Sequence, residues 1–146
     1  MQPVIRKMKI EDAKVMAQIE KECFEDPWSE QMLAEEFYLT NAIYSVVEID
    51  SKVIAYAGIR IILDEAHLTN VATLEQYRSK GIGNSLMQEL IKNAKAKGAK
   101  SMTLEVRVSN EKAIRLYEKN GFEIAGRRKK NYQNREDAFI MWNYSL

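Results

Sequence analysis

A short glycine-containing turn, placed between a strand-like segment and a long amphipathic helix, most constrains how this chain can fold. The turn reads Arg78-Ser79-Lys80-Gly81-Ile82-Gly83, and apolar residues recur about every four positions in the helix that follows it. Backbone N–H groups in a turn that leads into a helix N-terminus form a binding site for an anion such as a phosphate. Glycine lets an oxygen atom approach the backbone without a Cβ in the way. The alternative is a tight turn whose glycines only satisfy positive φ angles.

Two nucleotide-binding motifs can be compared with this turn. A Walker loop needs the pattern G-x-x-x-x-G-K-S/T, which the sequence does not contain. A dinucleotide fingerprint needs a third glycine where this chain has Leu86, and only one strand–helix–strand unit follows the turn. The sequence therefore predicts neither motif.

Hydrophobic periodicity divides the chain into strands and helices. We expect strands at 4–7, 43–49, 52–63, 66–74, 101–107, 122–130 and 137–144, and helices at 11–23, 29–38, 82–97 and 110–119. Asp50-Ser51 and Asp64-Glu65 are predicted turns, while Ser29 and either Ser109 or Asn110 are predicted N-caps. The order predicts an α/β (α+β) fold, with a mixed, mostly antiparallel sheet of about seven strands, about four helices and one βαβ crossover.

Length and composition place the chain among ordinary globular proteins. Its 146 residues are expected to form one domain, residues 1–146. No apolar run approaches the roughly 18 residues of a membrane span, so we expect no membrane association. A single cysteine, Cys23, excludes an internal disulfide, and with a single histidine, His67, it argues against a zinc site, so no metal is expected. These features predict a reducing, cytoplasmic location.

Charge is unevenly distributed along the chain. Residues 1–50 carry 11 acids and 5 bases, a balance of −6, whereas residues 75–135 carry 15 bases and 6 acids, a balance of +9. Such a chain can hold an anionic ligand with one part and a cationic ligand with another, or the lysines are merely solvated helix faces. The basic run at 127–130 has no aromatic platform beside it, which favours a solvated strand edge over direct contact with nucleic acid.

A second group of residues carries acid–base chemistry. Glu105 stands near the end of the strand at 101–107, and Tyr117 stands two turns inside the following helix. A carboxylate can accept a proton and a nearby phenol can donate one. The alternatives are a solvent-facing glutamate and a tyrosine of the core. Cys23 and His67 are expected to be structural, Cys23 in the core and His67 in a strand far from these motifs.

Together these segments resemble the GCN5-related N-acetyltransferases. Residues 78–83 match that family's Q/R-x-x-G-x-G/A signature, and residues 110–122 match its N-x-x-A-x-x-L-Y-x-x-x-G-F signature. The order of elements is similar over essentially the whole chain. Within the family the chain looks most like the RimI-type N-terminal alanine acetyltransferases. The segments that carry this closer match are Pro27-Trp28-Ser29, residues 63–66, residues 104–107 with Ser109-Asn110, and residues 135–138 with Ile140-Met141.

The resemblance implies an enzyme that moves an acetyl group from acetyl-CoA to the N-terminal α-amino group of a protein, a ribosomal protein being the expected partner. It also implies a monomer or a weak dimer. Glu105 would be the general base and Tyr117 the acid, while Trp28, Tyr132 and Glu105 would contact the acceptor. Strand residues near 70–73 would diverge from those at 101–107 to admit the pantetheine arm. The implied contacts of acetyl-CoA are Val71, Ala72, Thr73, Arg78, Ser79, Lys80, Gly81, Ile82, Gly83, Asn84, Asn110 and Tyr117.

One segment departs from the pattern of the resembled proteins. They carry two adjacent tyrosines and a longer loop before the Arg-Glu-Asp-Ala run, where this chain has Asn131-Tyr132-Gln133-Asn134. The acceptor therefore stays open between an α-amine, a lysine side chain and a small amine. A non-catalytic CoA-binding module is a further alternative, and Trp28 is either a lid over the acceptor or a packing residue at a helix start.

Overall fold

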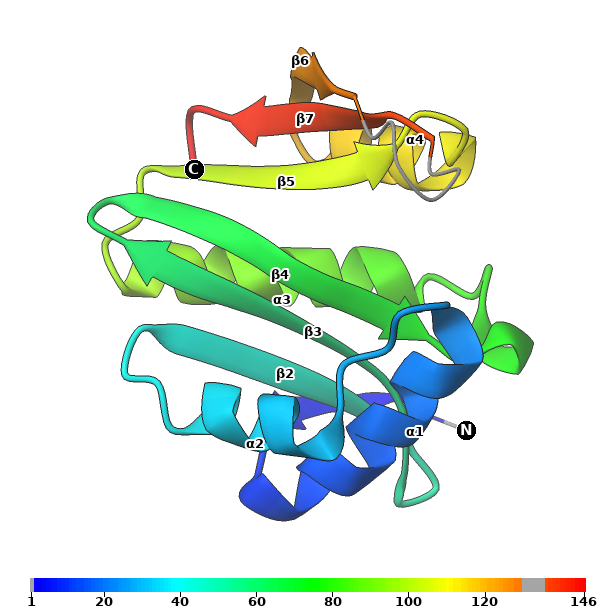
Figure 1. The fold of residues 1–146 in the computed structure, drawn as a ribbon. Coiled ribbons are helices and arrows are strands. Elements are labelled where there is room, and N and C mark those ends of the chain that lie inside the picture. Colours follow the sequence, from blue (N-terminus) through cyan, green and yellow to red (C-terminus); the bar gives the residue numbers. More distant parts are fainter. Residues whose placement is uncertain (1, 130–135) are drawn as a thin grey trace.

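A computed structural model describes residues 2–129 and 136–146 as one seven-stranded sheet with helices on both faces (Figure 1). The strand order is β1-β2-β3-β4-β5-β7-β6. Neighbouring strands run antiparallel except β4 and β5, which confirms the predicted mixed sheet with one βαβ crossover. The strands are β1 (Val4–Lys7), β2 (Ala42–Ile49), β3 (Lys52–Ile62), β4 (Glu65–Thr73), β5 (Ser101–Arg107), β6 (Glu123–Arg128) and β7 (Ala138–Asn143).

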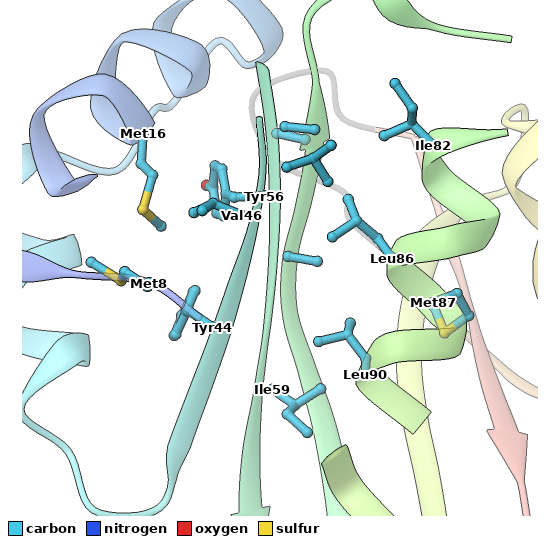
Figure 2. Close-up of a cluster of buried hydrophobic side chains, with 14 of the residues drawn as sticks. Met8, Met16, Tyr44, Val46, Tyr56, Ile59, Ile82, Leu86, Met87 and Leu90 are labelled. Carbon is cyan, nitrogen blue, oxygen red and sulfur yellow. The ribbon is translucent and has the colours of Figure 1, made fainter. Parts of the chain in front are cut away.

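The helices cover the two faces of the sheet separately. They are α1 (Ala13–Cys23), α2 (Glu30–Phe37), α3 (Ile82–Ala96) and α4 (Glu111–Lys119). Helices α1 and α2 lie in front of the sheet in Figure 1, and α3 lies behind it. Figure 2 shows Tyr44, Tyr56 and Met16 packing on the α1 side, with Leu86 and Leu90 packing on the α3 side. The core is thus two apolar layers separated by the sheet, because both of its faces are covered.

Local signals in the sequence explain most element ends. The Oγ atom of Ser29 accepts a hydrogen bond from the N–H of Met32, 3.1 Å away, and so caps α2. Asn110 caps α4 in the same way through the N–H of Ala113. Gly98 and Gly121 follow α3 and α4 with φ angles of +88° and +92°, which glycine adopts without strain. Both predicted helix stops are therefore confirmed.

Most predicted bounds lie within one or two residues of the observed ones, and two of the differences have a clear structural cause. The first turn of the predicted helix at 11–23 is a separate 3-10 turn, Ile10–Asp12, so α1 begins at Ala13. The second hairpin turns at Leu63-Asp64 rather than at Asp64-Glu65, and Leu63 has a φ of +57°. The carbonyl of Asp64 accepts the N–H of Lys100 at 2.7 Å, and Glu65 already pairs with both neighbouring strands. The long-range contacts of Asp64 with Lys100 and of Glu65 with Ser101 therefore make Glu65 the first residue of β4.

Strand β4 is irregular in its middle. Gly58 of β3 pairs with Asn70, whereas the next residue, Ile59, pairs with Leu68. Thr69 is therefore an extra residue in β4, a β-bulge that increases the local twist and changes the direction of the strand.

No helix within the described residues has the length and apolarity that a membrane crossing needs.

Candidate active site

A groove opens where β4 and β5 diverge. Their parallel pairing, among the described residues, covers only Glu65–His67 with Ser101–Thr103. Beyond it a groove of about 650 Å³ lies between the two strands. Residues of β6, β7, α4 and its N-cap, and the residue after α1 complete its walls. The predicted divergence near residues 70–73 is therefore present. Because unpaired strand backbone lines this groove, its N–H and C=O groups are available to a ligand.

Glu105 lies on β5 and lines the groove. Its side chain is 40% exposed, and one oxygen, Oε2, is 3.3 Å from Nε of Arg128 on β6. Alternation along β5 buries Leu104 and Val106 against the core, so Glu105 points to the opposite face. The carboxylate is thus in contact with solvent and with the groove, where it can accept a proton from a ligand directly or through one water molecule.

Tyr117 lines the same groove from α4 but is only 7% exposed. Its ring packs edge-on against Phe122 with the ring centroids 6.0 Å apart. Burial raises the pKa of Tyr117 to about 12, because the phenolate would lose its hydration. The phenol therefore stays protonated at neutral pH and can donate a proton or a hydrogen bond into the groove.

Asn110 also borders the groove, at the N-terminus of α4. Its Oδ1 atom accepts from the N–H of Ala113 at 3.2 Å, which fixes the amide orientation. The NH₂ group is then the part of the side chain that a ligand carbonyl can use.

The glycine-containing turn leads from the end of β4 into α3. Ser79 and Gly81 have φ angles of +62° and +81°, so consecutive backbone N–H groups turn toward one side before the helix begins. Arg78 ties the turn to β4, since its Nε donates to the carbonyl of Thr73 at 2.9 Å. Ile82 is buried in the core, so only its backbone can reach an anion. The turn keeps the geometry of an anion site, and Lys80 is exposed beside it.

Other predicted contacts lie in different surroundings. The side chain of Asn84 accepts from Asn120 at 2.9 Å, which links α3 to the end of α4. Ala72 is buried, so it also offers only its backbone. Trp28 packs against the core with its backbone N–H held by Glu20, which favours the packing alternative over the lid. Tyr132 lies outside the described residues.

Several groove residues were not among the predicted site residues, and two of them bear on the chemistry. Phe24 follows α1 and lines the groove, with 40% of the residue exposed, and Arg128 reaches Glu105 from β6. The expectation that His67 lies far from the motifs is wrong, because the parallel pairing sets it opposite Thr103 of β5. Its Nε2 is 3.1 Å from Glu65. Cys23 is half-buried beside Arg78 rather than enclosed in the core.

Comparisons with known proteins agree with this geometry. The model of the acetyltransferase (GNAT) family matches residues 13–122. A ribosomal protein bS18-alanine N-acetyltransferase of Escherichia coli (strain K12) is 36% identical over 143 residues, 94% of each chain. A Bacillus subtilis (strain 168) protein, whose name assigns the same activity provisionally, is 40% identical over 94% of this chain and 93% of its own.

Solved structures show the same fold. The crystal structure of the ribosomal-protein-S18-alanine N-acetyltransferase from Escherichia coli superposes with a TM-score of 0.90 at 33% identity, covering 99% of this chain and 96% of that one. These matches extend over nearly the whole sequence and confirm the resemblance carried by residues 78–83 and 110–122. The chain belongs to the acetyltransferase (GNAT) family and is an acetyl-CoA-dependent N-acetyltransferase.

Proposed function

We propose that this enzyme acetylates the N-terminal α-amino group of a protein, the N-terminal alanine of a small-subunit ribosomal protein. The single observation that carries the proposal is the groove between β4 and β5, which has Glu105 and Tyr117 on its walls. The names of the E. coli relatives support the choice of acceptor, since both specify an alanine of a ribosomal protein.

The donor lies along the crossover unit. The pyrophosphate of acetyl-CoA binds the backbone N–H groups of residues 78–84, where two positive φ angles precede α3. The pantetheine arm enters the groove, and the NH₂ group of Asn110 donates to one of its amide carbonyls. A backbone N–H near Val71 then holds the acetyl carbonyl. Donors placed at such an oxygen stabilise the oxyanion of the transition state by about 3 kcal/mol each.

Acetyl transfer proceeds by direct attack of the amine. Glu105, through a water molecule, takes a proton from the acceptor's ammonium group, and the neutral amine nitrogen bonds to the acetyl carbon. The nitrogen then gives up its second surplus proton to water. The tetrahedral intermediate collapses with cleavage of the carbon–sulfur bond, and Tyr117 protonates or hydrogen-bonds the departing thiolate. The exposure of Glu105 and the raised pKa of Tyr117 suit these two roles.

An α-amine is easier to activate here than a lysine. The attacking amine must be neutral, and an α-amino group has a pKa of about 7.7–8.0 against about 10.4 for lysine. Neutralising the α-amine near pH 7 costs less than about 1.5 kcal/mol, and lysine costs about 3–4 kcal/mol more. One exposed carboxylate is sufficient for the first task. Lysine would also need burial to lower its pKa, and Glu105 lies at an open part of the groove.

Exposed acidic residues in and before α2 support a basic acceptor. Glu25, Asp26, Glu30 and Glu35 are exposed in and before α2, so they can attract a basic peptide at low salt. Glu36 of α2 does not belong to this exposed group, because it is buried and forms an ion pair with Arg60.

The test is a competition between two peptides that share one basic sequence beginning with alanine. One has a free N-terminus, and the other has a blocked N-terminus and an internal lysine. We expect acetylation of the free peptide only, read by mass spectrometry. Equal or faster acetylation of the blocked peptide would identify a lysine acetyltransferase. Transfer to small amines alone would identify the small-amine alternative, and CoA binding without any turnover would identify a non-catalytic module.

A further inference from the structure

Two buried carboxylates, one on α1 and one on α2, lie on the side of the sheet that these helices cover. Glu20 is 1% exposed and Glu36 is 5% exposed. Burying a carboxylate is costly unless hydrogen bonds replace its water, and such groups contribute little net stability even when they are paired. Neither residue contacts solvent, so the steering and solubility roles of surface acids do not explain them.

Each carboxylate is surrounded by donors from distant parts of the chain. Glu20 accepts from the phenol of Tyr56, from Nδ2 of Asn70 at 3.0 Å and from the backbone N–H of Trp28 at 2.8 Å. Glu36 accepts from the phenol of Tyr44 at 2.9 Å and from both Nε and Nη2 of Arg60.

Both networks end on the bulge of β4. Asn70 donates directly to Glu20, and Oγ1 of Thr69 is 2.9 Å from the phenol oxygen of Tyr44. A carboxylate can only accept, so the single proton of Tyr44 points to Glu36, and Thr69 must be the donor to Tyr44. The chain Thr69–Tyr44–Glu36 therefore has one direction. Burial raises the pKa of both Tyr44 and Tyr56, which keeps the two phenols protonated.

These contacts explain how the bulge is held. In a regular strand, consecutive side chains point to opposite faces of the sheet. Thr69 and Asn70 both reach groups on the α1 and α2 side, which the extra residue in β4 makes possible. The bulge at Thr69 lies two residues before Val71, and Thr69 and Asn70 line the groove where β4 has left β5.

We propose that Glu20 and Glu36 are positioning residues, which lock the β4 bulge through Asn70 and through Tyr44–Thr69 so that the backbone near Val71 faces the acetyl carbonyl. This inference rests on the proposed function. The two carboxylates touch neither substrate nor cosubstrate. They fix the direction of a backbone donor that acts in the transition state, so their loss lowers kcat rather than affinity for CoA.

The test uses the Thr69–Tyr44 link, since each variant removes or keeps one hydroxyl. Thr69→Val and Tyr44→Phe are each expected to lower kcat about tenfold, less than the roughly 10²–10³-fold lost when an oxyanion donor itself is removed. The double variant should be no slower than the slower of the two single variants, because both changes remove the same Thr69–Tyr44 hydrogen bond. Thr69→Ser restores the hydroxyl and should recover most of kcat. Affinity for CoA, which has no acetyl group, should change less than twofold.

Asp12→Asn is the matched control. Asp12 is also a buried carboxylate paired with an arginine, Arg6, but it lies in the 3-10 turn before α1 and does not line the groove. It should lower thermal stability and leave kcat unchanged. The inference would be overturned if folded Thr69→Val and Tyr44→Phe had the same kcat as the parent enzyme. It would also be overturned if Thr69→Ser were as slow as Thr69→Val. An inactive parent enzyme would instead contradict the proposed function.

Discussion

The ring of Tyr44 lies directly over Gly58, in the space that a Cβ on residue 58 would occupy. The two residues are paired across β2 and β3, and Gly58 is also the residue where β3 meets the bulge of β4. A glycine in a strand interior often marks such a close approach. Here it lets the phenol of Tyr44 reach both Glu36 and Thr69.

Gly58→Ala is therefore expected to destabilise the protein by about 1–3 kcal/mol, the usual cost of overpacking a core. It should also lower kcat, because the displaced ring no longer holds Thr69. Urea unfolding and steady-state kinetics measure the two effects. Gly126→Ala is the matched control, since its Cβ would meet Ile140 at an ordinary 3.8 Å. Equal stability of the two variants would show that Tyr44 can move without loss.

The turn before α3 allows a comparison of two glycines. Gly81 and Gly98 have φ angles of +81° and +88°, and a Cβ on either would meet nothing within 4 Å. Alanine at each position should cost a similar stability of about 1–2 kcal/mol, through backbone strain alone. Only Gly81→Ala should lower affinity for CoA, by at least tenfold, because only that Cβ faces the proposed phosphate site. Calorimetry with CoA measures this difference. Equal affinity of both variants for CoA would contradict the placement of the pyrophosphate at this turn.

Much of the fold could be predicted from the sequence because its signals are local. Ser29 and Asn110 identify helix starts through capping, and Gly98 and Gly121 identify helix ends through positive φ. The helix at 82–96 follows from its apolar period. Such signals depend on neighbours within four residues, so a single sequence contains them.

The buried carboxylates could not be predicted in the same way. Glu20 and Glu36 sit among other charged residues of α1 and α2, and each reads as part of a solvated helix face. Their partners Tyr56 and Arg60 are 36 and 24 residues away in the sequence. The bulge at Thr69 and the position of His67 beside β5 likewise depend on strand register, which is set by long-range pairing.

Acid is expected to weaken the contact between Arg6 and Asp12. Burial alone would raise the pKa of Asp12, but hydrogen bonds from Arg6 and from the backbone of Lys9 bring it below its usual value. A carboxyl whose pKa is lowered by folding adds stability above its unfolded value of about 3.8, and that stability is lost as pH falls through the folded pKa. Urea unfolding between pH 7 and pH 3 should therefore show a smaller acid loss for Asp12→Asn than for the parent. Asp50→Asn, at an exposed turn, should lose as much stability in acid as the parent does. The same acid loss in Asp12→Asn as in the parent would contradict the lowered pKa of Asp12.

Glu105 and Tyr117, the proposed base and acid, can each be tested by removing one functional group. Glu105→Gln keeps the shape of the side chain and removes the base, so kcat should fall by about 10²–10⁴-fold. Tyr117→Phe should lower kcat as well, and by the same factor at pH 7 and at pH 9.5, because the phenol with a pKa of about 12 is protonated at both values. The kcat of the parent should rise as the acceptor amine loses its proton and should show no fall near pH 10, where an ordinary tyrosine ionises. Glu123→Gln and Tyr38→Phe, both at exposed positions, are the matched controls and should keep parental kcat. A fall of the parent's kcat near pH 10 that is absent in Tyr117→Phe would mean that Tyr117 titrates as an exposed phenol. A kcat equal to that of the parent in both Glu105→Gln and Tyr117→Phe would show that neither residue takes part in the reaction.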